Sequence, residues 1–309
     1  MSGKKPGILE MAMAPFLFAI IVPLTISTSL SVHIKGEFDI IGFIFAWVIG
    51  ISLHVTTNVY NDIYDTKQGS DTSKSSKNEF SGGSGILIKY PDMEKNMFDL
   101  ARSGIAIGFI SILGLLYISK REIWPLIATI YLVSVFFSKY YTAEPFKFAY
   151  RGLGEIVVWI GFGPLAILLG AIGQGVFFHP YIISIMPITG LSTLFIVWMG
   201  EMVDLPGDLE AGKKGLVARL GLKRGLYGHM FIHLLALLNV TYISYLIGPL
   251  TPIWIAVIPH IFLLPKIYLT LEGGLGERKV MKRASRLNFT LFFLFSLFLM
   301  AGFILQLFI

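Results

Sequence analysis

The chain carries little charge and contains no cysteine. Only 14% of its 309 residues are charged and 55% are hydrophobic, whereas about 25% of the residues of a soluble domain are charged. This shortage excludes an ordinary soluble enzyme and a disordered chain, because so many apolar side chains need an apolar environment, which lipid provides. The absence of cysteine excludes disulfides, thiolate metal sites and cysteine nucleophiles.

Long hydrophobic runs take up most of the chain. A run of about 20 apolar residues crosses a bilayer as a helix, because its backbone hydrogen bonds must be satisfied internally. We predict an all-α polytopic membrane protein, a bundle of nine transmembrane helices with two aspartate-rich cytosolic loops, in a single domain over residues 1–309. The first run is too long for a signal peptide, so we interpret it as a retained helix. The predicted spans are about 9–31, 39–60, 97–118, 122–141, 153–173, 178–200, 226–248, 251–271 and 287–308.

The net charge of +6 is sorted along the chain. With the N-terminus in the cytosol, 21 of the 25 Lys and Arg residues fall on cytosolic segments. The positive-inside rule therefore predicts a cell-membrane protein with a cytosolic N-terminus, and it explains the basic excess without a nucleic-acid partner. The four exceptions are Lys35, Lys120, Arg121 and Lys266.

Two windows near the predicted loops, which begin at Asn61 and at Glu201, hold five of the eight aspartates. Helical spacing would place the acidic residues of each window on one face. Carboxylate and amide oxygens suit Mg²⁺, which usually also bridges to the phosphates of a substrate. One acidic cluster is as often a solvated helix end as a site, but two clusters on one side favour a functional site. The spaced residues are Asn58, Asp62 and Asp65 in the first window and Glu201, Asp204 and Asp208 in the second, with Lys213, Lys214 and Arg219 following.

These motifs resemble those of the UbiA superfamily of intramembrane prenyltransferases, and the resemblance covers nearly the whole chain. The family pattern N-D-x-x-D with a further Asp corresponds to Asn61–Asp65 and Asp71, and the pattern D-x-x-x-D corresponds to Asp204–Asp208. The residues in and around the first motif are most similar to those of the menaquinone-type branch, which prenylates 1,4-dihydroxy-2-naphthoate. Segments 81–85 and 150–155 share this similarity, although Gly200, Glu201, Met202 and Val203 stand where many members of that branch have Asn-Asn-x-Arg.

The resemblance implies an enzyme of menaquinone-type quinone biosynthesis. It would transfer an isoprenyl chain from a polyprenyl diphosphate to an aromatic quinone precursor, with Mg²⁺ as cofactor and membrane lipid around it. The implied metal ligands are Asp62, Asp65, Asp204 and Asp208, and the implied catalytic set adds Lys213 and Asp71, the latter to orient or deprotonate the acceptor. The implied diphosphate-binding residues are Asn58, Asn61, Lys139, Tyr141 (or Tyr140), Lys147 and Arg151.

Other interpretations stay open at this stage. The acceptor could instead be 4-hydroxybenzoate or geranylgeranylglyceryl phosphate. A cation-coupled transporter would place its acidic residues near the bilayer midplane rather than at helix ends. His229 and His233 have the spacing of a metal-binding pair, but no third ligand accompanies them, which favours packing. His54 either lines the site or packs between helices, and Glu155 either caps a helix or joins the polar site.

Overall fold

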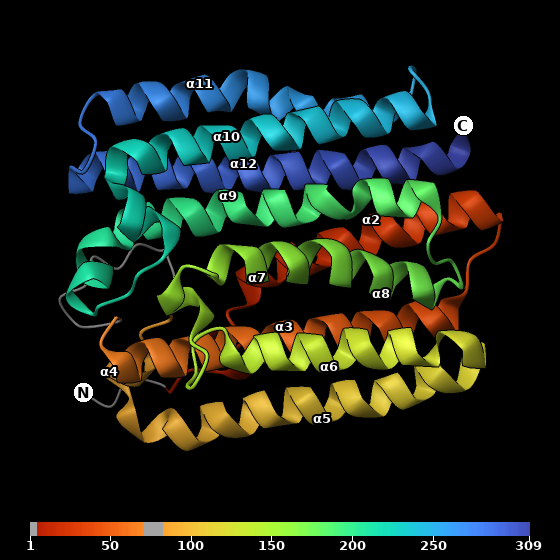
Figure 1. The fold of residues 1–309 in the computed structure, drawn as a ribbon, viewed down its shortest axis with the longest axis horizontal. Coiled ribbons are helices and arrows are strands. Elements are labelled where there is room, and N and C mark those ends of the chain that lie inside the picture. The colour runs from red at the N-terminus through yellow and green to blue at the C-terminus, as the bar shows by residue number, and fades with distance from the viewer. Residues whose placement is uncertain (1–4, 71–82) are drawn as a thin grey trace.

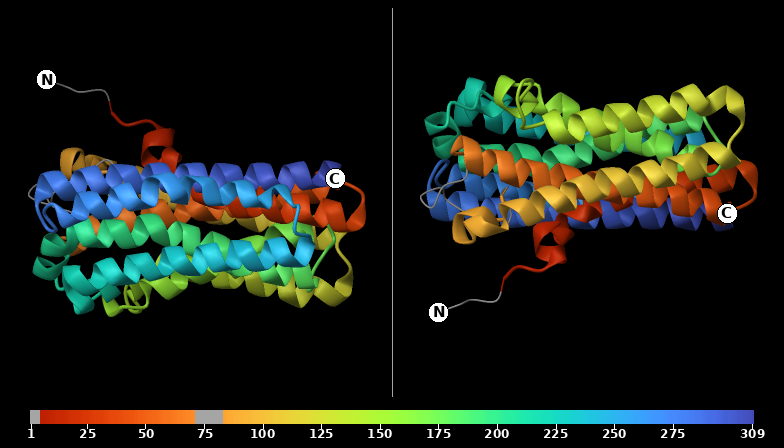
Figure 2. Two further views of the ribbon diagram at one scale, coloured as in Figure 1. Left: turned by 90° about the horizontal axis from the view of Figure 1, so that it is seen from above. Right: turned by 90° about the horizontal axis from the view of Figure 1, so that it is seen from below.

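The computed structural model of this chain describes residues 5–70 and 83–309. Within these ranges every regular element is helical. The long helices lie side by side along one axis, and the chain ends at the opposite end of the bundle from its start (Figures 1 and 2). The principal helices are α1 (Ile8–Met11), α2 (Phe18–Lys35), α3 (Ile40–Gln68), α4 (Ile86–Lys89), α5 (Glu94–Ile118), α6 (Trp124–Tyr140), α7 (Gly154–Ile160), α8 (Ala166–Gly173), α9 (Pro180–Glu210), α10 (Leu216–Ile247), α11 (Ile258–Glu272) and α12 (Arg278–Leu305).

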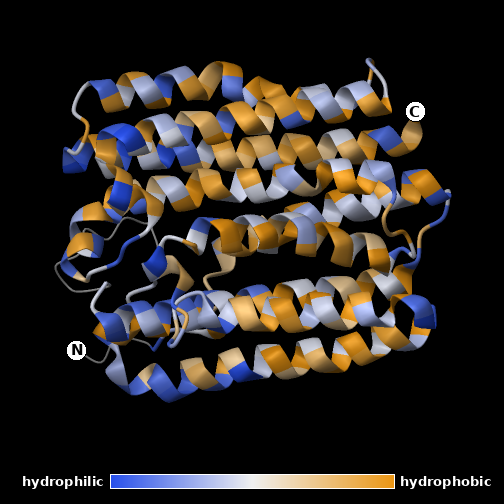
Figure 3. Ribbon diagram, viewed as in Figure 1, coloured by the Kyte–Doolittle hydropathy of each residue, from blue (hydrophilic) through white to orange (hydrophobic). Residues whose placement is uncertain are grey.

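Nine helical segments of the described residues are long and apolar enough to cross a bilayer, which confirms the predicted number. Hydrophobic residues fill the middle of the bundle, and hydrophilic residues gather towards its ends (Figure 3). The chain is therefore an integral membrane protein with an all-α fold. The nine segments are Ala14–Lys35, Ile40–Gln68, Pro91–Ile118, Arg121–Tyr140, Gly154–Gly173, Pro180–Glu210, Leu216–Ile247, Pro252–Glu272 and Arg278–Phe308.

The acidic motifs lie on helices, which corrects the prediction that they lie in loops. Helix α3 continues to Gln68 and α9 continues to Glu210, so only residues 211–215 connect α9 to α10. Hydropathy falls where polar residues begin at the membrane edge, so a span predicted from hydropathy stops there. The helix itself continues, because polar side chains do not interrupt its backbone hydrogen bonds. Helix α3 stops where Gly69 adopts a left-handed conformation with φ of 81°, which glycine adopts without steric cost.

The fifth span is interrupted at its centre. A π-helical segment over Gly161–Leu165 separates α7 from α8. Pro164 lies inside this segment and has no backbone N–H to donate, so it favours a local departure from α-helical hydrogen bonding. The wider turn changes the direction of the side chains between α7 and α8, and three of its residues line the cavity described below.

Helices α3 and α8 approach so closely that only glycine fits at the contact. A Cβ atom on Gly42 would lie 1.8 Å from the carbonyl oxygen of Gly173, and one on Gly173 would lie 2.7 Å from the carbonyl oxygen of Gly42. Small residues permit such approach between membrane helices, where close packing replaces the hydrophobic effect as the driving force. This contact fixes α3, which carries the first acidic motif, against the interrupted fifth span.

A buried polar network joins α10, α11 and α12. His229 lies 3.0 Å from the Tyr268 hydroxyl through Nδ1, and 3.1 Å from Oδ1 of Asn288 through Nε2. Nδ1 of His233 lies 3.1 Å from Nε2 of His260. Hydrogen-bond contacts thus connect these side chains one after another across the three helices. Among the residues that the structure describes, no group of three could hold a metal ion. The arrangement agrees with the packing interpretation of His229 and His233.

Replacing Asn288 by Leu is expected to destabilise the protein by about 1–2 kcal/mol. The Asn288 amide donates to the carbonyl oxygen of Phe195 at 2.7 Å, and its oxygen pairs with His229. Leucine removes both bonds and leaves a buried imidazole nitrogen without this partner. Thermal unfolding in detergent measures the effect, with Thr290→Val on the exposed face of α12 as the control. Equal melting temperatures for the Leu variant and the wild type would contradict the role of the network.

Candidate active site

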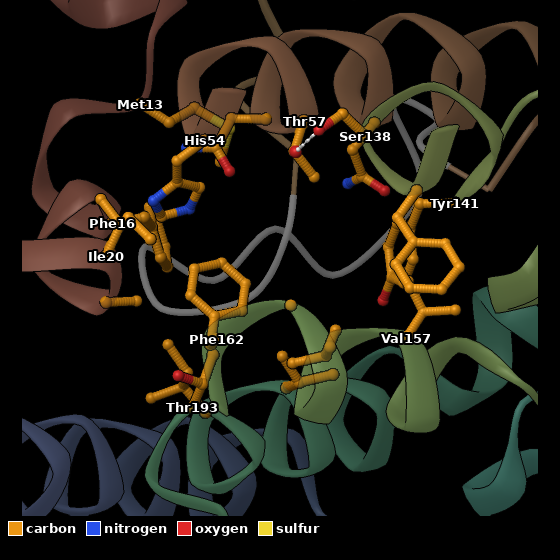
Figure 4. Close-up of a pocket in the computed structure, with 18 of the residues that line it drawn as sticks. Met13, Phe16, Ile20, His54, Thr57, Ser138, Tyr141, Val157, Phe162 and Thr193 are labelled. Atoms are coloured by element: carbon orange, nitrogen blue, oxygen red, sulfur yellow. Dashed lines mark hydrogen bonds between the residues drawn. The ribbon is translucent and has the colours of Figure 1, made fainter. Parts of the chain in front are cut away.

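A cavity of about 260 Å³ opens among α2, α3, α6, the fifth span and α9. One part is apolar and contains Phe16, Ile20 and Phe162, and Figure 4 shows these side chains gathered at one end of the space. Ser138 and Tyr141 face it from the opposite side (Figure 4). The other part is polar and contains Asp65, Glu201, Asp204 and Asp208 of the acidic motifs, whereas Asp62 is not part of the lining. The cavity therefore joins a charged recess at the helix ends to an apolar space inside the bundle.

The first motif is held by hydrogen bonds with three other segments: two of them donate to its carboxylates, and the third accepts from Asn58. The Tyr150 hydroxyl donates to Oδ1 of Asp65 at 2.8 Å. The backbone N–H of Ser84 donates to Oδ1 of Asp62 at 2.7 Å, and the Ser84 hydroxyl donates to the other oxygen. Asn58 donates from its amide to the carbonyl oxygen of Ala12 at 3.2 Å. Both carboxylates are buried, so the hydrogen bonds from Ser84 and Tyr150 compensate for the loss of water.

The second motif faces the first across the ammonium group of Lys213. Asp204 and Asp208 line the cavity on the last turns of α9, and Oδ1 of Asp208 accepts from the Ser70 hydroxyl at 2.9 Å. Lys213 Nζ lies 3.6 Å from Oδ1 of Asp208 and 3.8 Å from Oδ2 of Asp65. The structure thus brings Asp65 of the first motif, Asp204 and Asp208 of the second motif and the predicted lysine to one place.

The connection between α9 and α10 is fixed by its backbone. Lys213 N–H donates to the carbonyl oxygen of Asp208 at 2.8 Å, and Lys214 N–H donates to that of Tyr150 at 3.1 Å. The Arg219 guanidinium donates to the carbonyl oxygens of Lys214 at 2.9 Å and Arg151 at 2.7 Å. These bonds tie the connection after α9 to the connection after α6, and so hold Lys213 and Tyr150 beside the acidic residues.

The charge state of the site follows from this arrangement. Burial alone would lower the pKa of the Lys213 ammonium, but the carboxylates of Asp65 and Asp208 raise that pKa well above its usual range. Burial, reinforced by Asp65, raises the pKa of the Tyr150 hydroxyl, so this group keeps its proton and donates to Asp65. Burial also raises the pKa of Tyr141, with Glu201 as the next cause.

The residues of the site fit a magnesium ion. Lys213 already brings one positive charge between two carboxylates of different motifs, at distances beyond direct hydrogen bonds. The surrounding donors are carboxylate and amide oxygens, including those of Asn58 and Asn61 along the cavity wall, and hard oxygen ligands are the ones that Mg²⁺ prefers. In the described ranges, no three acidic or histidine side chains are grouped closely enough to hold a metal by themselves.

The remaining predicted residues are distributed more widely. Tyr141 lines the cavity, whereas Lys139 has its ammonium 5.1 Å from the Tyr140 ring. Lys147 and Arg151 line a separate, more open pocket, and Lys147 pairs with Glu144 at 2.7 Å. Asp71 lies outside the described residues. The structure therefore brings Lys213, Asn58, Asn61 and Tyr141 to the cavity, and it places Lys139, Lys147 and Arg151 outside its lining.

Three contacts of the site were not assigned from the sequence. No role was assigned to Tyr150 or Ser70 from the sequence, yet each donates to an aspartate. Glu155 does cap a helix, but the helix is α10 rather than its own, because its Oε1 accepts from Leu216 N–H at 2.7 Å. For Tyr150 and Ser70 the sequence offered one weak signal. Each is a polar residue close to a glycine that ends a helical turn, Gly152 for Tyr150 and Gly69 for Ser70.

Known proteins resemble this chain in sequence. The profile of the UbiA prenyltransferase family matches residues 96–297. The chain is 29% identical over 213 residues to a 2-carboxy-1,4-naphthoquinone phytyltransferase of Synechocystis sp., covering 68% of this chain and 65% of that one. It is 27% identical to a 1,4-dihydroxy-2-naphthoate octaprenyltransferase of Bacillus subtilis, covering 67% of this chain and 63% of that one. The chain thus spans slightly less than two thirds of the length of these relatives.

The fold also matches a solved structure. A UbiA homolog from Archaeoglobus fulgidus, bound to DMAPP and Mg²⁺, superposes with a TM-score of 0.61 over 95% of this chain and 99% of that chain, at 12% identity. Such low identity supports the shared fold alone. The family profile, however, matches well over half of the chain, and the nine-span bundle agrees with it. This chain belongs to the UbiA prenyltransferase family.

Proposed function

We propose that this chain transfers an isoprenyl group from a polyprenyl diphosphate to an aromatic quinone precursor, with 1,4-dihydroxy-2-naphthoate as the first candidate. One unit over residues 1–309 would carry the reaction in the cell membrane. The observation that carries the proposal is the convergence of Asp65, Asp208 and Lys213 at the polar end of an apolar cavity. The two naphthoquinone-type relatives support the choice of acceptor.

The polar end suits the diphosphate of the donor. The Lys213 ammonium, charged at physiological pH, would pair with phosphate oxygens, and the amides of Asn58 and Asn61 face the same space. Asp62, Asp65, Asp204 and Asp208 would hold Mg²⁺, which when bound neutralises charge on the leaving diphosphate. The hydrogen bonds from Ser84 and Tyr150 keep the carboxylates oriented in advance.

The apolar part suits the hydrocarbon and the ring. As the C1–O bond of the donor breaks, diphosphate leaves with the electron pair, and a carbon of the electron-rich ring attacks the allylic C1. The ring then loses a proton and regains its aromaticity. Water would capture the same allylic carbon as an alcohol, so exclusion of water directs the outcome. Phe16, Ile20, Leu53 and Phe162 line that part of the cavity and provide this exclusion.

The orientation proposed from the sequence agrees with the place of the site. The acidic motifs and Lys213 lie at the bundle end that carries the Lys- and Arg-rich connections, coloured blue at the left of Figure 3. By the positive-inside rule this end would face the cytosol. The acids lie at helix ends rather than at the bilayer midplane, which argues against the transporter alternative.

A direct assay tests the proposal. Purified protein with Mg²⁺ and geranylgeranyl diphosphate is expected to prenylate 1,4-dihydroxy-2-naphthoate more efficiently than 4-hydroxybenzoate or geranylgeranylglyceryl phosphate, with products separated by chromatography and mass spectrometry. Product from one of the other acceptors alone would transfer the assignment to that acceptor. Absence of any product, with cation flux in proteoliposomes, would replace the enzyme by a transporter.

Removal of divalent metal is expected to lower turnover at least about 100-fold, because the leaving diphosphate loses its main charge stabilisation. The rate is measured after chelation with EDTA and again after Mg²⁺ is added back in excess. Recovery with Mg²⁺ but not with an equal ionic strength of NaCl separates metal binding from screening. Full activity in EDTA would contradict the metal assignment of the four aspartates.

A further inference from the structure

A histidine to which the mechanism assigns no task lies beside the apolar part of the cavity. His54 extends from α3 towards the space between Phe16 and Phe162 (Figure 4). The side chain is 93% buried, since only 7% of its surface is exposed. Its Nδ1 atom is buried without a hydrogen-bond partner among the described residues. Buried polar atoms are usually paired in folded proteins, and His54 differs from the other unpaired buried groups in that it combines its unpaired Nδ1 with a place in the cavity lining beside Phe162, so this nitrogen is available to a ligand in the cavity.

The position of His54 along α3 indicates which ligand. His54 lies four residues before Asn58, which corresponds to about 6 Å along the helix axis. Asn58 and Asn61 line the polar part of the cavity, where the donor diphosphate would end and its C1 atom begin. The attacking ring carbon must approach C1 to about 3–3.5 Å. A ring in that position would extend along α3, away from Asn58, and would reach the level of His54.

The surroundings of His54 suit a flat aromatic ring with a hydroxyl group. The imidazole meets the Phe162 ring edge to face, with centroids 4.8 Å apart and an interplanar angle of 74°, which fixes its orientation. Phe16 and Ile20 provide apolar contact area beside it. The isoprenyl chain has no hydrogen-bonding group beyond its diphosphate, so it offers Nδ1 nothing. A phenolic hydroxyl does.

We propose that His54 binds the acceptor substrate, its Nδ1 accepting a hydrogen bond from a ring hydroxyl while Nε2 carries the imidazole proton. The inference rests on the proposed prenyl transfer, because it assigns the phenol of that reaction to a specific residue. The bond would align the ring with the apolar walls and would favour phenols over ethers and over acceptors without an aromatic hydroxyl. His54 therefore selects the acceptor class and leaves donor binding unchanged.

Two substitutions separate the nitrogen from the ring. His54→Phe keeps an aromatic ring against Phe162 and removes Nδ1, whereas His54→Asn places an amide oxygen near the Nδ1 position. Equilibrium binding is measured on the full chain in detergent with Mg²⁺, for 1,4-dihydroxy-2-naphthoate and separately for an unreactive thiolo analogue of geranylgeranyl diphosphate. His33→Phe, at an exposed site on α2, is the control.

His54→Phe is expected to weaken acceptor binding about tenfold, as the loss of one buried hydrogen bond predicts, while donor affinity stays within about twofold. His54→Asn should recover most of the acceptor affinity. The dimethyl ether of the same naphthoate should bind wild type and His54→Phe equally. An equal loss for phenol and ether, or a loss of donor affinity instead, would overturn the proposal.

Binding without turnover distinguishes failure of this inference from failure of the proposed function. A wild type that binds donor and phenol but forms no product would refute prenyl transfer, while the His54→Phe comparison would still decide the role of His54. A wild type that forms product, with acceptor affinity unchanged in His54→Phe, would refute the inference and leave the proposed function in place. A wild type that binds no phenol refutes the inference as well.

Discussion

Replacement of Asp208 by Asn is expected to lower kcat/KM about 1000-fold or more. The carboxylate accepts from Ser70 at 2.9 Å and lies 3.6 Å from Lys213 Nζ, at the centre of the proposed diphosphate site. An amide of the same size keeps the packing but removes the negative charge that holds Mg²⁺. Without that charge the remaining aspartates hold Mg²⁺ less tightly and the leaving diphosphate loses part of its charge stabilisation, so the loss falls on the chemical step.

The Asp208→Asn experiment needs a matched control and a test of folding. Asp99→Asn makes the same charge change at an exposed position on the same side of the bundle, where Asp99 pairs loosely with Arg102 at 3.6 Å, and it should retain wild-type turnover. Thermal unfolding of both variants should remain cooperative. Asp62→Asn provides a second test in the first motif. Wild-type kcat/KM in both motif variants would refute the metal assignment, whatever the product.

The number of spans could be predicted because hydrophobicity is a property of local sequence. The ends of α3 and α9 could not, because the helices continue beyond the membrane edge to Gln68 and Glu210, where hydropathy no longer distinguishes helix from loop. The i, i+4 spacing of Asn58 and Asp62 places both side chains on one face only if the helix continues through them. The spacing was therefore compatible with a longer helix but did not establish one. The break at Gly161–Leu165 depends on Pro164, and a proline in an apolar run predicts disruption without specifying its form.

The part of the site that could be predicted consists of residues in short sequence motifs. Asp65, Asp208 and Lys213 meet as their spacing and predicted side indicated. The bonds from Tyr150 to Asp65 and from Ser70 to Asp208 span 85 and 138 residues, so only tertiary packing defines them. For the same reason, positive charge alone could not indicate that Lys139 faces a tyrosine ring.

Replacement of Lys213 by Met is expected to lower kcat/KM about 100-fold, because one charge-assisted contact to the leaving diphosphate is lost. Methionine retains much of the volume, so packing is little changed. Lys214→Met makes the same substitution on the next residue, whose side chain is exposed, and should retain most of the activity. If both variants lose activity equally, a general basic surface rather than Lys213 itself binds the donor.

The same substitution also tests whether the ammonium stands where a metal would bind. In metal-free protein, Lys213→Met leaves Asp65 and Asp208 facing each other without a cation, which should cost up to about 3 kcal/mol. A divalent ion can restore that balance, so Mg²⁺ should raise the melting temperature of the variant more than that of the wild type. An equal or smaller response in the variant would mean that Mg²⁺ binds away from these two carboxylates. Lys213 would then be a phosphate ligand with no part in balancing the charge of the empty site.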